Sequence, residues 1–511
     1  MRANEQQVCM RPLHLVFALL CSACAIAQAA NTINFTHTRG PHAVGMRVVQ
    51  QVDYSRSVEV DLNAFGESKS GERARPMQTL IWYPAQAGAL VPMQAIDYEL
   101  TKLTDYEVGV SAADIAKARA SWLGGANAAL LTQPMWATRD AAPATGKHPV
   151  VIFAPSFGAR AYENADLCEY LASYGYIVLA TRSSGPRSKQ MSDDLEGLEA
   201  QATDIGFLTA YAHSLAHADS SRLAVVGFSW GGLANVIASA RSTRIKALVS
   251  LDGSVRSHAH LIAAGSVKPA RTAVPMLSIG SRPMSLETLN QKGRSVASSY
   301  LNSMKYSDVY LANMMPMVHM NFSSWSLRFD GDQQFTDYSS AEVANAYSWS
   351  ARYVKEFLDA YLKQDAAALA FLARTPVKNG VPAHMMALEA RPASAAVPTN
   401  ASFIKAFVGR GFKDAEAIYK AMLAQSPEFV LIPPQLTTWG YQLLERKNAS
   451  GAAELFKLAT VINPEYAAVF DSLGEAYEAL GEKALAIKAY EQAVALDKQQ
   501  TNAAARLKAL R

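Results

Sequence analysis

The chain has 511 residues, of which half are apolar and 18% are charged, and this is the composition of a globular protein with two or three domains. The formal net charge is only +4 and no long basic run occurs, so the sequence indicates no nucleic-acid partner.

The first 29 residues have the pattern of an export signal. Arg2 and Arg11 give a positively charged start, residues 13–26 an apolar segment, and residues 27–29 a small-residue cleavage site. The apolar segment is short for a membrane-spanning helix, and an uncleaved anchor is the alternative interpretation. We expect a periplasmic or secreted protein that has no transmembrane span after cleavage.

The cysteines fit this prediction. Cys9, Cys21 and Cys24 would leave with the signal, and the residues before Cys21 and Cys24 do not favour a lipid anchor. Cys168 would remain and could form no internal disulfide. It lies in a helical pattern, and we assign it to the core.

Strand and helix patterns then alternate up to about residue 375. Residues 75–84 predict a strand that ends at a proline, and residues 88–147 predict an insertion or cap with a helix near 112–120. Further strands are expected at 150–154, 176–181, 223–226, 245–251, 274–279 and 307–312, with helices at 162–174, 195–216, 233–240 and 341–362. Most of these strands are continuous apolar runs, which is typical of a parallel sheet covered on both faces. Residues 30–375 are therefore predicted to form an α/β domain.

The remainder of the chain has a different pattern. Residues 376–400 are rich in Pro and Ala and predict a linker to a helical domain at 401–511. An interval of 34 positions separates Gly440 from Gly474, Ala452 from Ala486, Phe456 from Tyr490 and Ala459 from Ala493. These residues resemble the tetratricopeptide pattern, in which small residues let paired helices approach and aromatic residues fill the space between them. The resemblance implies a protein partner, and a plain helical bundle is the alternative.

The chemistry is centred on Ser229. An apolar strand precedes the Gly-x-Ser-x-Gly sequence at residues 227–231, and a helix of small residues follows it. In this setting the serine occupies a sharp, strained turn, and Gly227 and Gly231 leave room where side chains would collide. An incidental serine is the alternative, because the short motif also occurs by chance.

An acid and a base should follow such a serine in that chain order. Asp252 comes directly after the strand at 245–251, at the edge where ligands gather in α/β sheets, although it could also cap a turn with Gly253. The other carboxylates fit less well, because Glu287 lies several residues beyond the next strand and Asp308 lies at the wrong end of its strand.

His319 follows the last predicted strand, where the general base is expected. His258 and His260 invite a metal interpretation, but no nearby residues complete a ligand set, and we expect them in a loop. His384 lies in the predicted linker. We therefore expect neither a metal nor a cofactor.

The oxyanion of an acyl transfer needs backbone amides. We expect them from Trp230, directly after the serine, and from Phe157, in the loop after the strand at 150–154. Ser156 could instead cap the helix that follows.

These segments together resemble the platelet-activating-factor acetylhydrolase branch of the α/β-hydrolases, whose bacterial relatives are often termed dienelactone-hydrolase-like. The resemblance rests on the segments that contain Ser229, Asp252 and His319 and covers about residues 40–375. The chain departs from it at residues 155–157, where relatives often have His-Gly, and true dienelactone hydrolases have a cysteine nucleophile. The resemblance implies an α/β-hydrolase fold and hydrolysis of short-chain or lipid-like carboxylic esters.

Three functions remain open at this point. The first is a serine ester hydrolase that works through an acyl-enzyme. The second is a weak or inactive hydrolase domain that serves a scaffold role through the helical repeats. The third is lipase or peptidase activity on the same three side chains, because residues 88–147 and 253–270 contain no readable specificity code.

Overall fold

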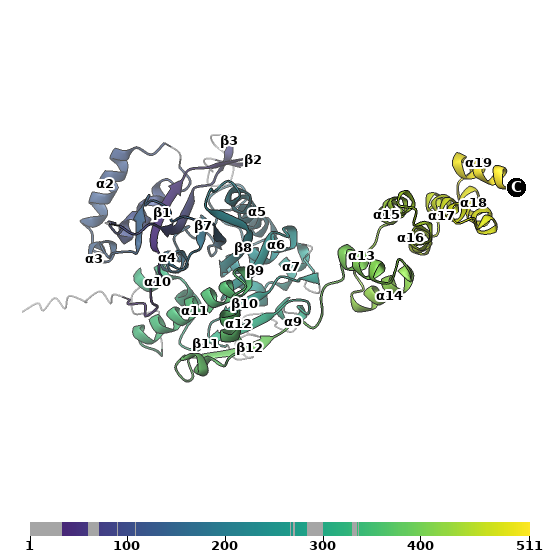
Figure 1. Cartoon of the computed structure of the whole chain (residues 1–511). Coiled ribbons are helices and arrows are strands. Elements are labelled where there is room, and N and C mark those ends of the chain that lie inside the picture. Colours follow the sequence, from purple (N-terminus) through teal and green to yellow (C-terminus); the bar gives the residue numbers. More distant parts are fainter. Residues whose placement is uncertain are drawn as a thin grey trace, which may run out of the picture.

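The computed structural model describes residues 33–59, 71–88, 90–107, 109–265, 267–268, 271–283, 300–329, 335 and 337–511. The predicted signal at residues 1–29 and the carboxylate of Glu287 lie outside these residues. Figure 1 shows a broad α/β domain, followed by a series of helices that leads to the C-terminus. No helix in the described part of the chain is both long enough and apolar enough to span a membrane.

A mixed sheet is the centre of the α/β domain. Over the described residues it has ten strands in the order β12-β11-β10-β9-β8-β6-β7-β4-β1-β5. Its parallel centre consists of β6 (His148–Ala154), β7 (Ile177–Thr181), β8 (Ala218–Phe228), β9 (Ile245–Leu251), β10 (Met276–Gly280) and β11 (Val309–Met314). These strands are almost wholly buried, as the continuous apolar runs predict.

Shorter or antiparallel strands complete both edges. They are β1 (Ala43–Val49), β4 (Thr79–Ala85), β5 (Ala137–Arg139) and β12 (Met386–Arg391), while β2 (Val52–Glu59) and β3 (Glu72–Pro76) form a separate hairpin. The strand predicted at 75–84 differs from the structure in two ways. It is divided between β3 and β4, and Pro84 lies inside β4.

The predicted linker at 376–400 also differs from the structure. It contains a short 3-10 helix, η6 (Pro376–Asn379), and then β12, which pairs antiparallel with β11. Residues 307–312 therefore do not correspond to the last strand of the sheet. β12 is a half-exposed edge strand, and its short alternating pattern in a Pro- and Ala-rich segment gave no continuous apolar run to detect.

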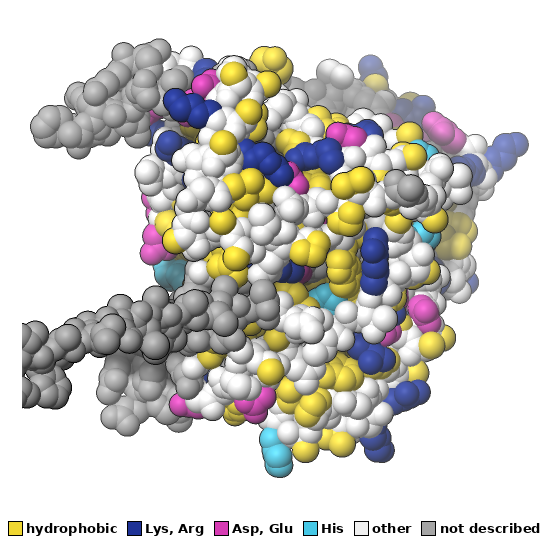
Figure 2. All heavy atoms as spheres, turned by 90° about the vertical axis from the view of Figure 1, so that its left-hand side faces the viewer, with side chains coloured by type: hydrophobic (Ala, Val, Ile, Leu, Met, Phe, Trp, Pro, Cys, Tyr) yellow, Lys and Arg dark blue, Asp and Glu magenta, His cyan; other side chains and the backbone are white. Residues whose placement is uncertain are grey.

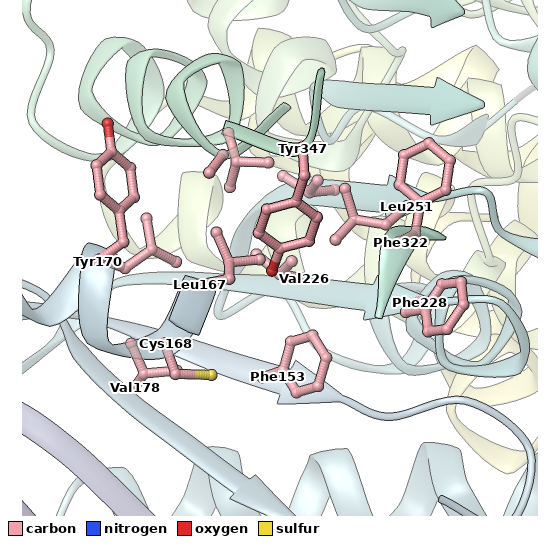
Figure 3. Close-up of a cluster of buried hydrophobic side chains, with 14 of the residues drawn as sticks. Phe153, Leu167, Cys168, Tyr170, Val178, Val226, Phe228, Leu251, Phe322 and Tyr347 are labelled. Atoms are coloured by element: carbon pink, nitrogen blue, oxygen red, sulfur yellow. The ribbon is translucent and has the colours of Figure 1, made fainter. Parts of the chain in front are cut away.

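Helices cover both faces of the sheet. α4 (Ala165–Ser173) and α11 (Ser340–Leu362) contribute to one buried cluster, whereas α5 (Leu195–Ala212) and α6 (Trp230–Arg241) contribute to the other. In Figure 3, Phe153, Val226 and Phe228 of the strands lie near Leu167 and Cys168 of α4 and Tyr347 of α11. Cys168 is a buried free cysteine, in agreement with its assignment to the core.

Several short elements surround this framework. Between β4 and β5 lie α1 (Ala95–Glu99), η1 (Leu100–Leu103), α2 (Ala112–Leu123) and α3 (Ala128–Leu131). After β9 come η2 (Ser254–Arg256), α7 (Ala259–Ala264), α9 (Tyr300–Ser303), η4 (His319–Phe322), α10 (Ser324–Phe329) and α12 (Ala366–Leu372).

The C-terminal part is all helical. Its helices are α13 (Asn400–Gly409), α14 (Ala415–Gln425), α15 (Pro433–Glu445), α16 (Ala449–Ile462), α17 (Ala467–Ala479), α18 (Lys483–Leu496) and α19 (Thr501–Leu510). A Cβ atom at Gly440 would lie 2.2 Å from the Phe456 ring, and one at Gly474 would lie 2.4 Å from the Tyr490 ring. The pairs α15–α16 and α17–α18 thus make the same close contact at equivalent positions.

Candidate active site

Ser229 lies at the sharp turn between β8 and α6. Its backbone has φ 53° and ψ −114°, a strained conformation for a residue with a side chain. Two glycines make the turn possible. A Cβ atom on Gly227 would lie 2.2 Å from the Gly231 carbonyl oxygen, and one on Gly231 would lie 2.0 Å from that of Ala154. The strand, the turn and the helix expected from the sequence are all present.

The structure brings the serine, the aspartate and the histidine together. His319 Nε2 lies 2.9 Å from Ser229 Oγ, and His319 Nδ1 lies 2.6 Å from Asp252 Oδ2. The imidazole packs against the Phe228 ring, with 5.1 Å between the ring centroids. It remains about half exposed, whereas Asp252 is largely buried, so the hydrogen-bonded chain runs from the interior to the surface.

Neighbouring groups hold Asp252 in place. Its second carboxylate oxygen accepts a hydrogen bond of 2.8 Å from the Ser281 amide, and the Ser281 carbonyl accepts one from Asn313. Burial by itself would raise the pKa of Asp252, but the hydrogen bond and charge of His319 and the bonds from Ser281 outweigh it, so the pKa lies below its usual value. Asp252 is therefore ionised at neutral pH and orients the imidazole.

The segment that contains His319 is a tight 3-10 turn. Asn321 Oδ1 accepts a hydrogen bond of 2.8 Å from the Val318 amide and so braces the turn from inside. Asn321 and Phe322 are both buried, and the Phe322 ring lies 6.5 Å from that of Phe228. The His-x-Asn-Phe sequence thus places the histidine on a rigid support.

The proposed oxyanion residues, Phe157 and Trp230, lie next to each other. Trp230 is the first residue of α6, where amides have no partner within the helix. Phe157 lies in the turn after β6, and its half-exposed ring contacts the Trp230 ring edge to face, with 5.6 Å between centroids. Their roles as oxyanion donors stay a prediction.

Of the two histidines expected in a loop, His258 directly precedes α7 and His260 lies inside that helix. The His258 ring lies 5.9 Å from the Trp230 ring, and its Nδ1 is bonded to the Ser254 carbonyl. Asp308 accepts hydrogen bonds from the Tyr361 hydroxyl and the Ala393 amide, at the opposite end of the sheet from Ser229. Within the described ranges, no three His, Cys, Asp or Glu side chains are grouped in a way that could hold a metal ion.

Sequence reasoning missed a buried carboxyl group next to the site. Glu163, just before α4, contacts Ser156 through both of its carboxyl oxygens. Nothing in the sequence around Glu163 marks it, because its role depends on a contact that only the folded loop creates. Gln201 was missed for the same reason, and its side chain donates a 2.7 Å hydrogen bond to the Pro155 carbonyl.

On the face of the molecule shown in Figure 2, hydrophobic side chains gather around a central hollow, and charged side chains of both signs are scattered around them.

Comparisons with known proteins bear on the family and the fold. Residues 135–273, which include Ser229 and Asp252 but not His319, match the dienelactone hydrolase family. A solved structure of a ferulic acid esterase from Streptomyces cinnamoneus is similar, with a TM-score of 0.50 and 20% sequence identity over 70% of this chain and 99% of that chain. No curated protein matches the chain. The predicted α/β-hydrolase fold, followed by an all-helical region, is thereby confirmed.

Proposed function

We propose that this protein is a serine ester hydrolase that cleaves short-chain or lipid-like carboxylic esters through an acyl-enzyme. The observation that carries the proposal is the continuous hydrogen-bonded chain from Ser229 Oγ through the His319 ring to Asp252, built on a strained turn. The match to a hydrolase family and the likeness to an esterase fold support it.

The proposed reaction has the following steps. Ser229 Oγ attacks the ester carbonyl while His319 Nε2 takes its proton, and the Phe157 and Trp230 amides bind the oxyanion. His319 then returns the proton to the leaving alcohol, and the acyl group stays on Ser229. A water molecule that gives its proton to His319 attacks the acyl-enzyme, and the acid leaves as Ser229 regains its hydrogen.

The test is turnover of a panel of esters of graded acyl length by the wild type and by Ser229→Ala. Loss of the nucleophile should lower kcat by about 10⁴-fold or more, because a serine, its base and its acid act as a unit. Ser239→Ala is a matched control, since its hydroxyl also lies on α6 but bonds only the Val236 carbonyl.

Labelling by a fluorophosphonate separates this function from its alternative. Stoichiometric modification of the wild type, absent in Ser229→Ala, is expected for an active enzyme. A folded wild type that neither reacts nor hydrolyses any ester would contradict the proposal and favour an inactive domain with a scaffold role.

We also propose that the C-terminal helices form tetratricopeptide-type units that hold a protein partner. The matched contacts of Gly440 with Phe456 and of Gly474 with Tyr490, at an interval of 34 positions, support the repeat.

A further inference from the structure

Glu163 holds the loop that follows β6 by two hydrogen bonds to one residue. Its Oε2 accepts the Ser156 amide at 2.7 Å, and its Oε1 lies 2.5 Å from the Ser156 hydroxyl. Ser156 directly precedes Phe157, and the Ala159 amide donates to the Ser156 carbonyl to close the turn. Both hydrogen-bond donors of the residue next to Phe157 are therefore held by a single carboxyl group.

The main chain at the same position also holds the segment that follows the His319 turn. The Glu163 carbonyl accepts hydrogen bonds from the Trp325 amide and the Ser323 hydroxyl, each 3.1 Å long. Asn164 Oδ1 accepts the Ser324 amide at 2.9 Å. These residues directly follow the His319–Phe322 turn, so one short segment connects the loop of Phe157 with the segment of the proposed base.

The burial of Glu163 makes these bonds strong constraints. Glu163 is only 7% exposed, and burial raises the pKa of its carboxyl group to about 7 in spite of the hydrogen bonds from Ser156 and the charge of His319, which lower it. Burying an ionisable carboxyl group costs free energy, so its oxygens must be compensated by hydrogen bonds. In both the neutral and the ionised form it can accept the Ser156 amide.

We propose that Glu163 is a positioning residue for ester hydrolysis, which fixes Ser156 and thereby aims the Phe157 amide at the oxyanion. The inference rests on the proposed function and assigns a supporting role that goes beyond it. Glu163 itself touches neither the serine nor the histidine. It acts because an amide must already point at the developing charge to stabilise it, and a loop free to turn would lose that alignment.

Three variants of Glu163 separate geometry from charge. Glu163→Leu removes both hydrogen bonds, and Glu163→Asp keeps the acid but is too short to reach Ser156 with both oxygens. Glu163→Gln keeps the reach, since its oxygen can accept the Ser156 amide and its NH₂ can donate to the hydroxyl. Glu169→Leu is the matched control, because Glu169 is an equally buried carboxyl that holds Tyr98 and the Trp136 amide instead.

The readouts are kcat, KM, the rate of fluorophosphonate labelling and the urea midpoint of unfolding for the full chain. We expect Glu163→Leu and Glu163→Asp to lower kcat and the labelling rate by about 10- to 100-fold, somewhat less than the loss of an oxyanion donor itself, with KM changed little. Glu163→Gln should stay within about threefold of the wild type. Glu169→Leu should lower the midpoint without lowering kcat.

The inference is overturned if Glu163→Asp keeps the wild-type kcat, or if Glu163→Gln loses as much as Glu163→Leu. It is also overturned if kcat falls with stability alike in the Glu163 and Glu169 variants. If Glu163→Leu does not fold, the contrast between Glu163→Asp and Glu163→Gln decides. A wild type without any ester turnover or labelling would reject the proposed function itself, whereas an active wild type with a normal Glu163→Asp variant rejects only this role.

Discussion

At the scale of single residues, the site depends on a turn that has no spare volume. Because a Cβ atom on Gly231 would lie 2.0 Å from the Ala154 carbonyl oxygen, which is backbone and cannot rotate away, Gly231→Ala must displace β6 or α6. We expect kcat to fall by at least about 100-fold, since a displacement of about 1 Å already costs this much in a catalytic geometry. Ester turnover and the urea midpoint measure the two effects.

Gly206→Ala is the control for this substitution. Gly206 is exposed on α5, and a Cβ atom there would contact nothing within 4 Å. Alanine should raise the free energy of unfolding by about 0.5–1 kcal/mol through helix propensity and leave kcat unchanged. Equal activity of the Gly231→Ala protein and this control would show that the turn tolerates a side chain.

The residues that could be predicted from the sequence are those whose role follows from chain order. Ser229, Asp252 and His319 each follow a predicted strand of a parallel sheet, and strand ends on one edge bring such residues together. Glu163 and Asn313 could not be found in this way. Their partners, Ser156 and Ser281, are chosen by loop conformation, which no periodic pattern encodes.

At the scale of elements, the same reasoning explains which strands were predicted. The parallel strands β6 to β11 are buried on both faces, so each appears as an apolar run in the sequence. β12, β5 and the β2–β3 hairpin lie at edges or outside the sheet, and their exposed residues interrupt the apolar run. An edge strand forms because it pairs with a neighbouring strand that lies far away in the sequence, and a local sequence pattern does not show this pairing.

Helix α4 has a pH-dependent stability of its own. Burial raises the pKa of Glu169 from 4.5 to about 7, with Asp166 adding to the shift. The folded state therefore binds a proton that the unfolded state releases between pH 4.5 and 7, and this contribution to stability is full below pH 4.5 and is lost as the pH rises through 7. At about 1.4 kcal/mol for each pKa unit, its size is on the order of 3 kcal/mol.

Glu169→Gln removes this titration and tests it. Glutamine has only one oxygen, so either the Trp136 amide or the Ala137 amide is left facing its NH₂ group, and the variant should be destabilised at pH 5. Because the wild type alone loses stability on ionisation, the difference in unfolding free energy between the two proteins should shrink as the pH rises from 5 to 8. Urea titrations at several pH values measure this difference, and a gap that stays constant or widens would contradict the pKa shift.

At the scale of the whole molecule, the chain has two kinds of hydrophobic core that share no member among the described residues. The clusters on the two faces of the sheet end at residue 386, and those of the helical part begin at Phe403. Polar contacts connect the described residues of the two parts: the Tyr306 hydroxyl and Lys305 Nζ donate to the Gln425 carbonyl at 2.8 and 3.4 Å, and Lys268 lies 3.4 Å from Glu428. We expect the two parts to unfold independently.

Substitutions in the helical part can test this independence in the full chain. Alanine at Gly440 and Gly474 together would push Cβ atoms into the Phe456 and Tyr490 rings and should cost about 1–3 kcal/mol at each site, whereas Gly409→Ala meets nothing within 4 Å. In urea unfolding monitored by circular dichroism, the helical transition should occur at a lower urea concentration than in the wild type. The urea dependence of ester turnover should stay as in the wild type and in the Gly409→Ala control. If turnover were lost together with the helical signal, the helices would be stabilising the hydrolase domain, and the two parts would not unfold independently. Cooperative unfolding requires energetic coupling between the parts.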